Sequence, residues 1–155
     1  MAAGWDSELA QTIIARSLVL EGPALPILHG LQAAFGCVPQ PAIPMMAEAL
    51  NISRAEAHGI VTFYHDFRDR PAGRRVVKVC RAEACQATGG AVAGEALLQL
   101  LGLAWGETTP DGAITVEPVY CLGLCAVAPA AMVDGEPHGR LDAVRLAEAV
   151  LAEGA

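Results

Sequence analysis

The sequence contains no long hydrophobic run. Its longest apolar stretches are about eight residues, far short of the ~20 residues that a membrane-spanning helix needs. Residues 1–8 also lack a basic region followed by an apolar one, so no secretory signal peptide is expected. From these two absences we expect a cytoplasmic protein that makes no direct contact with a membrane.

Positive charge is missing from a large part of the chain. Between Ala82 and Gly139 there is no Lys or Arg, while the same stretch holds seven Asp and Glu residues. The whole chain has 10 Lys and Arg against 17 Asp and Glu, a formal net charge of −7, which argues against a nucleic-acid-binding protein. Six cations precede this stretch closely, at Arg68, Arg70, Arg74, Arg75, Lys78 and Arg81. They form either a solvated surface or a site where a partner subunit docks.

The composition excludes a disordered chain. Of the 155 residues, 54% are hydrophobic and only 17% are charged, so the chain can bury a sizeable core. The length corresponds to one domain, or to one domain with an appendage. The sequence has neither an internal repeat nor a low-complexity segment.

Hydrophobic periodicity predicts helices in the first half of the chain. Apolar residues at helical spacing indicate helices over Asp6–Leu20, Pro23–Phe35, Met45–Leu50 and from Ser53 to about Tyr64. Gly36 is expected to end the second of these helices. The segment Ser53-Arg54-Ala55-Glu56 has the capping-box pattern, in which a Ser oxygen and a Glu carboxylate bind each other's free backbone N–H groups.

The pattern changes after about residue 72. It predicts strands over Arg74–Val79 and Ala113–Val119, a hairpin from Ala131–Val133 to the region of His138, and helices over Gly90–Leu101 and Leu141–Ala152. We therefore predict an α+β protein with an N-terminal helical bundle, residues 1–72, followed by an α/β domain, residues 73–155.

Four of the five cysteines form two close pairs. Cys80-x4-Cys85 and Cys121-x3-Cys125 are separated by 35 residues, and each pair follows a predicted strand. An odd number of cysteines without an export signal is typical of a reducing compartment. If the two strands are neighbours, the loops after them bring all four sulfurs to one end of the sheet. Four thiolates select an iron–sulfur cluster or zinc over hard cations.

The spacing of the pairs bears on the choice of metal. Zinc sites prefer C-x2–4-C pairs, so zinc is permitted, but zinc modules are small and depend on the metal to fold. Here an apolar helix and strand lie between the pairs, and a four-cysteine 2Fe–2S cluster tolerates such uneven spacing. Spacing therefore favours an iron–sulfur cluster, with a zinc-stabilised interaction module and unliganded thiols as alternatives. A thiol oxidoreductase is disfavoured because it needs a Cys-x-x-Cys pair, which the sequence lacks.

The segments around the cysteines resemble those of one known family. They are Val79-Cys80-Arg81-Ala82-Glu83-Ala84-Cys85, then Cys121-Leu122-Gly123-Leu124-Cys125-Ala126-Val127-Ala128-Pro129, and Gly59-Ile60-Val61-Thr62-Phe63-Tyr64 in the first half. With them the chain is similar to the thioredoxin-like 2Fe–2S subunits of NADH-linked dehydrogenases. These are small peripheral subunits of respiratory complex I, of NAD-reducing hydrogenases and of NAD-dependent formate dehydrogenases.

This resemblance implies a fold, a cofactor and a set of ligands. It implies a thioredoxin-like fold for residues 73–155 and one 2Fe–2S cluster bound by Cys80, Cys85, Cys121 and Cys125, with each pair on one iron. Gly123 and Pro129 are then expected to shape the second loop, so that backbone N–H groups reach sulfur.

The resemblance also implies partners. The family's members bind beside a flavin-carrying, NADH-binding subunit, with which the cluster exchanges single electrons. The segment Thr62-Phe63-Tyr64-His65-Asp66-Phe67-Arg68 and the short length are most similar to the gamma subunit of a molybdenum-dependent formate dehydrogenase, whose large subunit carries the molybdenum. The chain itself is expected to be a non-catalytic electron carrier, since it has neither a G-x-G-x-x-G after a strand nor a convergent acid/base pair.

Two further features carry open interpretations. Cys37 follows an apolar helix and is expected to be a buried, small hydrophobic residue. The aromatic residues Phe63, Tyr64 and Phe67 belong either to the core or to the apolar centre of a subunit interface.

Overall fold

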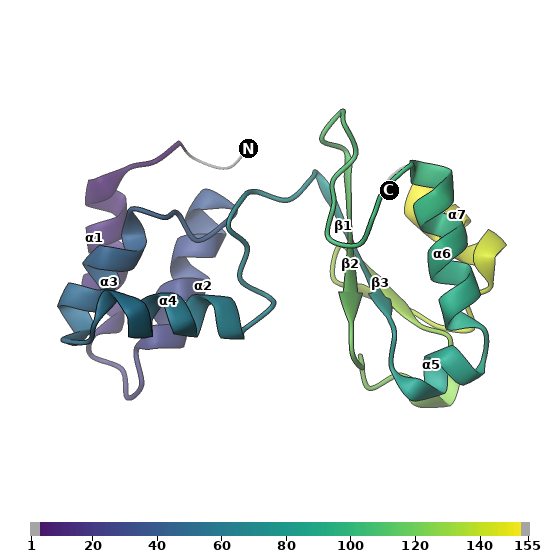
Figure 1. Cartoon of the computed structure of the whole chain (residues 1–155), viewed down its shortest axis with the longest axis horizontal. Coiled ribbons are helices and arrows are strands. Elements are labelled where there is room, and N and C mark those ends of the chain that lie inside the picture. Colours follow the sequence, from purple (N-terminus) through teal and green to yellow (C-terminus); the bar gives the residue numbers. More distant parts are fainter. Residues whose placement is uncertain (1–3, 153–155) are drawn as a thin grey trace. The chain divides into compact units, whose positions relative to one another are not determined.

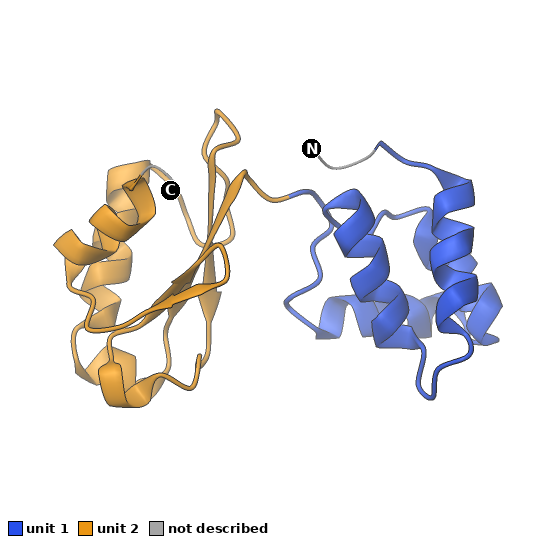
Figure 2. Ribbon diagram, turned by 180° about the vertical axis from the view of Figure 1, so that it is seen from behind, with its two compact units in different colours: residues 1–71 blue, residues 72–155 orange. Residues whose placement is uncertain are grey.

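The computed structural model describes residues 4–152. The chain forms two compact units, Met1–Pro71 and Ala72–Ala155 (Figure 2). No helix formed by residues 4–152 combines the length and the apolar character that crossing a membrane requires.

The N-terminal unit consists of helices (Figure 1). They are α1 (Ser7–Ser17), α2 (Ala24–Phe35), α3 (Ala42–Leu50) and α4 (Arg54–Phe63). All four predicted helices are confirmed, with changed ends. The third begins three residues earlier than predicted and includes Pro44 in its first turn, where the missing N–H of a proline costs no helical hydrogen bond.

The ends of these helices follow the capping chemistry of the sequence. The side chain of Asp6 accepts hydrogen bonds from the backbone N–H groups of Glu8 and Leu9, at 2.9 and 3.1 Å, and so begins α1. Gly36 ends α2 in the left-handed conformation, with φ of 77°. The predicted capping box at the start of α4 is confirmed, with Ser53 and Glu56 bonding each other's backbone N–H groups.

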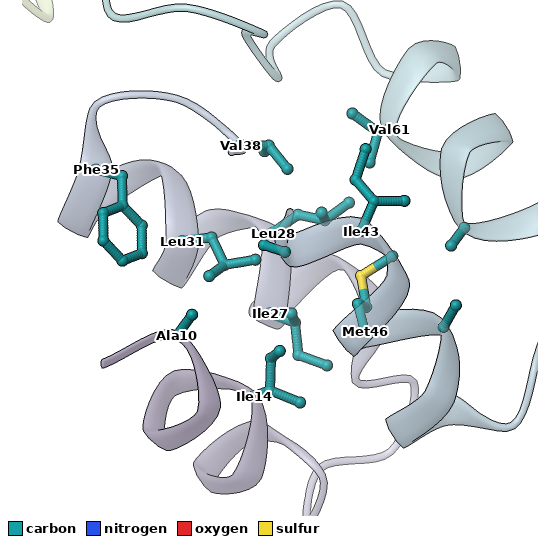
Figure 3. Close-up of a cluster of buried hydrophobic side chains, with 13 residues drawn as sticks. Ala10, Ile14, Ile27, Leu28, Leu31, Phe35, Val38, Ile43, Met46 and Val61 are labelled. Carbon is teal, nitrogen blue, oxygen red and sulfur yellow. The ribbon is translucent and has the colours of Figure 1, made fainter. Parts of the chain in front are cut away.

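The four helices enclose one apolar core (Figure 3). Its largest fully buried side chains are Ile27, Leu28, Leu31, Val38 and Met46. Gln32 fixes the segment after α4 to α2, because its amide donates to the carbonyl of Asp66 at 2.7 Å and accepts from the N–H of Arg68 at 2.8 Å.

The C-terminal unit is a four-stranded sheet with helices. Its elements in chain order are β1 (Arg75–Cys80), α5 (Glu83–Ala87), α6 (Gly90–Leu101), β2 (Ile114–Val119), the 3₁₀ turn η1 (Cys125–Val127), β3 (Ala131–Val133), β4 (Glu136–His138) and α7 (Ala143–Leu151). The strand order is β2-β1-β3-β4. β1 runs parallel to β2 and antiparallel to β3, and β3 and β4 form the predicted hairpin.

Helices α6 and α7 cover one face of this sheet (Figure 1). Alternate residues of the central strand, Val77 and Val79, point into that layer and pack with Leu97 of α6, Val116 of β2 and Leu146 of α7. The α+β fold class predicted from the sequence is confirmed. Helix α5 was not predicted, because a helix of five residues is too short to show a periodic pattern.

Candidate functional site: two cysteine pairs

Two parallel strands bring the cysteine pairs to one edge of the sheet. Cys80 is the last residue of β1 and pairs in register with Val119, the last residue of β2. The N–H of Arg81 extends the pairing by donating to the carbonyl of Val119 at 2.7 Å. Cys121 follows two residues after β2. The two strands are therefore neighbours, as the four-sulfur site requires.

The second cysteine of each pair does not lie in an open loop, contrary to expectation. Cys85 lies within α5, and Cys125 opens η1. The turn at Thr88 and Gly89 leads directly into α6, whose first residue, Gly90, leaves no room for a side chain. A Cβ atom at this position would lie 2.6 Å from the carbonyl oxygen of Cys85. Close packing of α6 on α5 thus fixes the backbone at Cys85.

The two pairs differ in exposure. Cys80 and Cys85 are buried, with 3% and 2% of their surface exposed, whereas Cys121 and Cys125 are exposed. The buried pair forms a small apolar cluster with Ala130, and Leu122 and Leu124 pack against it. The leucines of the second loop thus point inward, and its cysteines remain accessible.

The spacing of the exposed sulfurs suits two ligands of one tetrahedral metal ion. The Sγ atoms of Cys121 and Cys125 are 3.8 Å apart. Two sulfurs held at ~2.3 Å by one tetrahedral metal ion lie ~3.8 Å from each other. A 2Fe–2S cluster with four cysteine ligands divides its thiolates between two iron ions. The donor set and this pairing therefore fit such a cluster.

Backbone hydrogen bonds favour the thiolate form of Cys80. Burial acts to raise the pKa of this thiol, but it is outweighed by a hydrogen bond from the backbone of Ala82, by one from the Cys85 thiol and by others from the backbone of Leu122 and Cys121. The pKa of Cys80 is therefore lowered. Since the thiolate is the form that binds metal, groups from the segments after β1 and β2 both favour Cys80 as a ligand.

The pKa values of Cys85 and Cys125 are raised. Burial, together with the hydrogen bond to Cys80, raises the pKa of Cys85. The hydrogen bond to Cys121 and the charge of that residue raise the pKa of Cys125. Each pair therefore resists holding two negative charges, and a bound cation removes this repulsion.

Gly123 has the position that the sequence predicted for it. Its N–H donates to the Sγ of Cys121 at 3.3 Å, and its own φ of 76° favours glycine. Cys121 has a φ of 117°, a strained value for a residue with a side chain. The carbonyl of Pro129, the other residue predicted to shape this loop, accepts a hydrogen bond from the N–H of Leu141 at 3.0 Å.

Among the six clustered cations, Arg74, Arg75 and Arg81 contact identified groups within the chain. Arg75 pairs with Asp134, Arg74 donates to the carbonyl of Asp111, and the guanidinium of Arg81 lies 4.8 Å from the ring centre of Trp105. These contacts give the three arginines a structural role, which the sequence alone did not reveal.

Two predictions concern residues outside the cysteine site, Cys37 and the aromatic residues near the end of α4. Cys37 is buried, as predicted, and burial, with the nearby charge of Asp69, raises its pKa. Phe63 is 72% exposed and Tyr64 is also exposed, so these two residues are not part of the core. Phe67 is half-buried against the core, and its ring contacts those of Tyr64 and His29 edge to face.

Comparison with known families agrees with the chemistry of the site. The sequence pattern of the thioredoxin-like [2Fe-2S] ferredoxin family matches residues 10–153. The chain belongs to this family. The recognition made from the cysteine segments is thus confirmed, and the predicted cofactor, one 2Fe–2S cluster, is the one that defines the family.

Individual relatives are subunits of NADH- and NADP-linked enzymes. The chain is 42% identical, over 110 residues, to an NADH-quinone oxidoreductase subunit of Pseudomonas aeruginosa, covering 70% of this chain and 66% of the relative. It is 31% identical, over 121 residues, to the HndA subunit of the NADP-reducing hydrogenase of Solidesulfovibrio fructosivorans, covering 78% of this chain and 71% of the relative. The chain thus spans about two thirds of the length of these proteins.

A solved structure shows the same arrangement of elements. The crystal structure of an NAD⁺-reducing [NiFe]-hydrogenase in the air-oxidised state contains a chain that superposes with a TM-score of 0.64 at 27% identity. The match covers 79% of this chain and 22% of the hydrogenase chain.

Proposed function

We propose that this chain is a one-electron carrier in an NAD-dependent oxidoreductase complex, and that Cys80, Cys85, Cys121 and Cys125 bind one 2Fe–2S cluster. The pairing of the thiols, seen in the 3.8 Å separation of the Cys121 and Cys125 sulfurs, carries this proposal. Membership of the ferredoxin family supports it. Residues 73–155 then form the cluster domain and residues 1–72 a separate helical domain.

When bound, the cluster supplies reversible one-electron chemistry, in which one electron reduces one of two Fe(III) ions to Fe(II). The residues of the chain provide the ligands and the surroundings. Backbone hydrogen bonds from Ala82 and Leu122 act to lower the pKa of Cys80, and the N–H of Gly123 donates to the Cys121 sulfur. Hydrogen bonds to sulfur and burial are the means by which a protein sets the reduction potential of a cluster.

The electron comes from, or goes to, the flavin of a partner subunit that binds NADH. A reduced flavin holds two electrons and must pass them on singly to an iron–sulfur cluster. The relatives are subunits of enzymes that act on NADH, NADP or NAD⁺, which supports such a partner.

For the parent complex we propose a molybdenum-containing, NAD-dependent formate dehydrogenase. The support is the resemblance of the segment from Thr62 to Arg68 to the gamma subunit of that enzyme. In this complex the electrons originate at molybdenum in the large subunit and end on NAD⁺. The second candidate is a complex I or hydrogenase subunit, which is favoured by the 42% identity to the Pseudomonas protein.

Two measurements test the proposal. Iron and acid-labile sulfide are assayed on anaerobically purified protein, and we expect both, with visible absorption and an electron paramagnetic resonance signal that appears only on reduction. A colourless protein with one zinc per chain would refute the cluster. Copurification with the native partners then distinguishes the complexes: molybdenum in a partner indicates formate dehydrogenase, nickel and iron indicate hydrogenase, and a membrane arm indicates complex I.

A further inference from the structure

We infer that Arg81, held against the ring of Trp105, raises the reduction potential of the proposed 2Fe–2S cluster and so determines how readily this chain accepts an electron. Arg81 acts on the cluster through its charge and is not a ligand. This inference rests on the proposed function. It assigns a role to two residues that neither the cysteine pattern nor the family relationship specifies.

The first argument is the charge of the cluster and of its surroundings. A 2Fe–2S cluster with four thiolate ligands has a net charge of about −2 when oxidised and about −3 after it accepts one electron. The chain adds seven acidic side chains and no Lys or Arg over residues 82–139. These surroundings disfavour the reduced state, and a cation close to the ligands offsets them.

The second argument is the position of Arg81. It directly follows Cys80, and no other Lys or Arg adjoins any of the four proposed ligands in the sequence. Its N–H donates to the carbonyl of Val119 in β2 at 2.7 Å, and its carbonyl accepts from the side-chain amide of Gln86 in α5 at 2.7 Å. The charge is therefore carried by a residue whose backbone is tied to two elements of the cysteine site.

The third argument is that the side chain of Arg81 is held in place by an aromatic ring. Its guanidinium carbon lies 4.8 Å from the ring centre of Trp105, within the range of a cation–π contact. Trp105 is half-buried against the core of the C-terminal unit. Gly94 of α6 makes room for the indole, since a Cβ atom there would lie 3.0 Å from its Cη2 atom. Because the ring is uncharged, it positions the cation without neutralising it.

Two other cations of the same region are placed differently. Lys78 lies two residues before Cys80, but it is paired in register with Glu117 of β2, whose negative charge offsets it. Arg74 directly precedes β1 and lies six residues before Cys80, which corresponds to ~20 Å along an extended strand. This length exceeds the Debye length of ~8–10 Å in physiological salt. Of these three cations, Arg81 therefore has the largest effect on the cysteine site.

The test measures the reduction potential of the cluster in the intact chain, by titration with dithionite followed by electron paramagnetic resonance and visible absorption. We compare Arg81→Gln, which removes the charge, with Arg81→Lys, which keeps it. Arg74→Gln is the matched control, because it removes the same charge from the far end of β1. Trp105→Leu keeps an apolar side chain but removes the ring that holds the guanidinium.

Arg81→Gln is expected to lower the ratio of reduced to oxidised cluster at a fixed potential by about threefold to tenfold, which for one electron is a fall of about 30–60 mV. A unit charge ~10 Å away changes an equilibrium on the order of tenfold at an effective dielectric constant of ~20, and water at a half-exposed side chain reduces this effect. Trp105→Leu should give a smaller fall, because the charge remains but moves into water. Arg81→Lys and Arg74→Gln should stay within about twofold of the unchanged protein.

Equal potentials for Arg81→Gln and the unchanged protein overturn the inference. An equal fall in Arg81→Lys also overturns it, since the shape of the side chain and not its charge is then responsible. An equal fall in Arg74→Gln does the same, because it shows an effect of net charge alone. All variants should keep their iron and sulfide, and loss of the cluster in Arg81→Gln assigns this residue to the structure of the site instead. Absence of iron and sulfide from the unchanged protein overturns the proposed function itself, so the two failures are distinguishable.

Discussion

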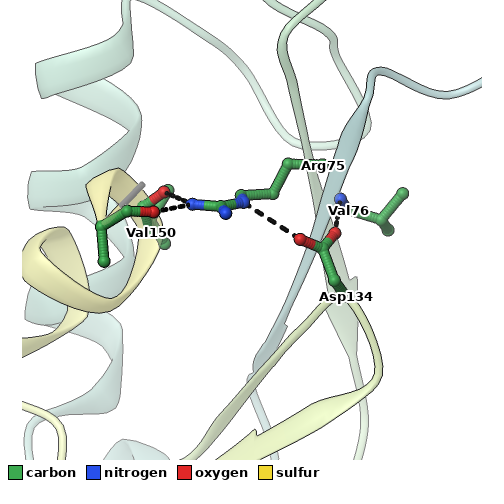
Figure 4. A network of polar contacts seen from close by, with 5 residues as sticks. Arg75, Val76, Asp134 and Val150 are labelled. Atoms are coloured by element: carbon green, nitrogen blue, oxygen red, sulfur yellow. Dashed lines mark hydrogen bonds and ion pairs between the residues drawn. The ribbon is translucent and has the colours of Figure 1, made fainter. Parts of the chain in front are cut away.

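Arg75 and Asp134 join the first strand of the sheet to the turn of the β3–β4 hairpin. The Nε of Arg75 lies 3.0 Å from the Oδ2 of Asp134, whose Oδ1 accepts the N–H of Val76 at 2.8 Å (Figure 4). The other end of the guanidinium donates to the carbonyls of Val150 and Ala152, at 2.7 and 2.5 Å. One side chain therefore binds the end of α7, where a helix has free carbonyls and favours positive charge.

Replacing Arg75 with Leu should destabilise the C-terminal unit by about 1–2 kcal/mol, because the two carbonyls lose a charged donor. The ion pair itself adds little, since Asp134 is half-exposed. Denaturant unfolding of the intact chain measures this change. The matched control is Arg145→Gln, which removes a long contact of 4.0 Å to Asp142 between two exposed side chains. It should change stability by less than ~0.5 kcal/mol, and an equally large effect in the control would contradict the role of Arg75.

Local patterns were sufficient to predict most of the fold. The β-branched run before Cys80 predicted β1, Asp134-Gly135 predicted the hairpin turn, and Ser53 with Glu56 predicted the start of α4. These features depend on residues close together in the sequence. The place of β3 on the free edge of β1, antiparallel to it, was not predicted, because strand order is decided by packing between distant segments.

The residues of the candidate site could be proposed from the sequence, but the difference in exposure between its two cysteine pairs could not. Cysteine spacing and the strands before each pair indicated which sulfurs meet. The spacing could not show that one pair is buried and the other exposed. That difference arises from long-range packing, of α6 on α5 at Gly90 and of Leu122 and Leu124 on the buried pair. The glycines Gly89-Gly90, which follow the first cysteine pair, were a local sign that the backbone of α6 approaches that of α5 closely.

Cys121→Ala should abolish the cluster, because it removes one of the two sulfurs that lie 3.8 Å apart. We expect loss of visible absorption and of iron, while the helical content of the N-terminal unit stays unchanged in circular dichroism, since its core lies in the other compact unit. Cys37→Ala is the matched control, as Cys37 is buried in the N-terminal unit, and it should keep the cluster. Unchanged absorption in Cys121→Ala would contradict the ligand assignment.

Gly90→Ala should lower both stability and cluster content. Its Cβ would lie 2.6 Å from the Cys85 carbonyl oxygen and 3.0 Å from the carbonyl carbon, so backbone must move. We expect a loss of about 1–3 kcal/mol and less iron per chain, because the displaced residue is a proposed ligand. Gly59→Ala is the control: nothing lies within 4 Å of a Cβ atom there, and alanine in α4 should stabilise by about 0.5–1 kcal/mol. Full iron content in Gly90→Ala would show that this packing does not position Cys85.

The capping box of α4 should make stability depend on pH in the acid range. The backbone N–H of Ser53, followed by its hydroxyl, lowers the pKa of Glu56 below its ordinary value by donating to the ionised carboxylate. The folded state therefore gains stability that is complete above the unfolded pKa of ~4.3 and is lost as the pH falls through the lower folded pKa. Glu56→Gln can still cap the helix but does not titrate. Its melting temperature should lie below that of the unchanged protein at pH 7, and the difference should shrink below about pH 4. Glu48→Gln in α3 controls for the general loss of one negative charge, and a difference that stays constant from neutral to acid pH would exclude the carboxylate as its source.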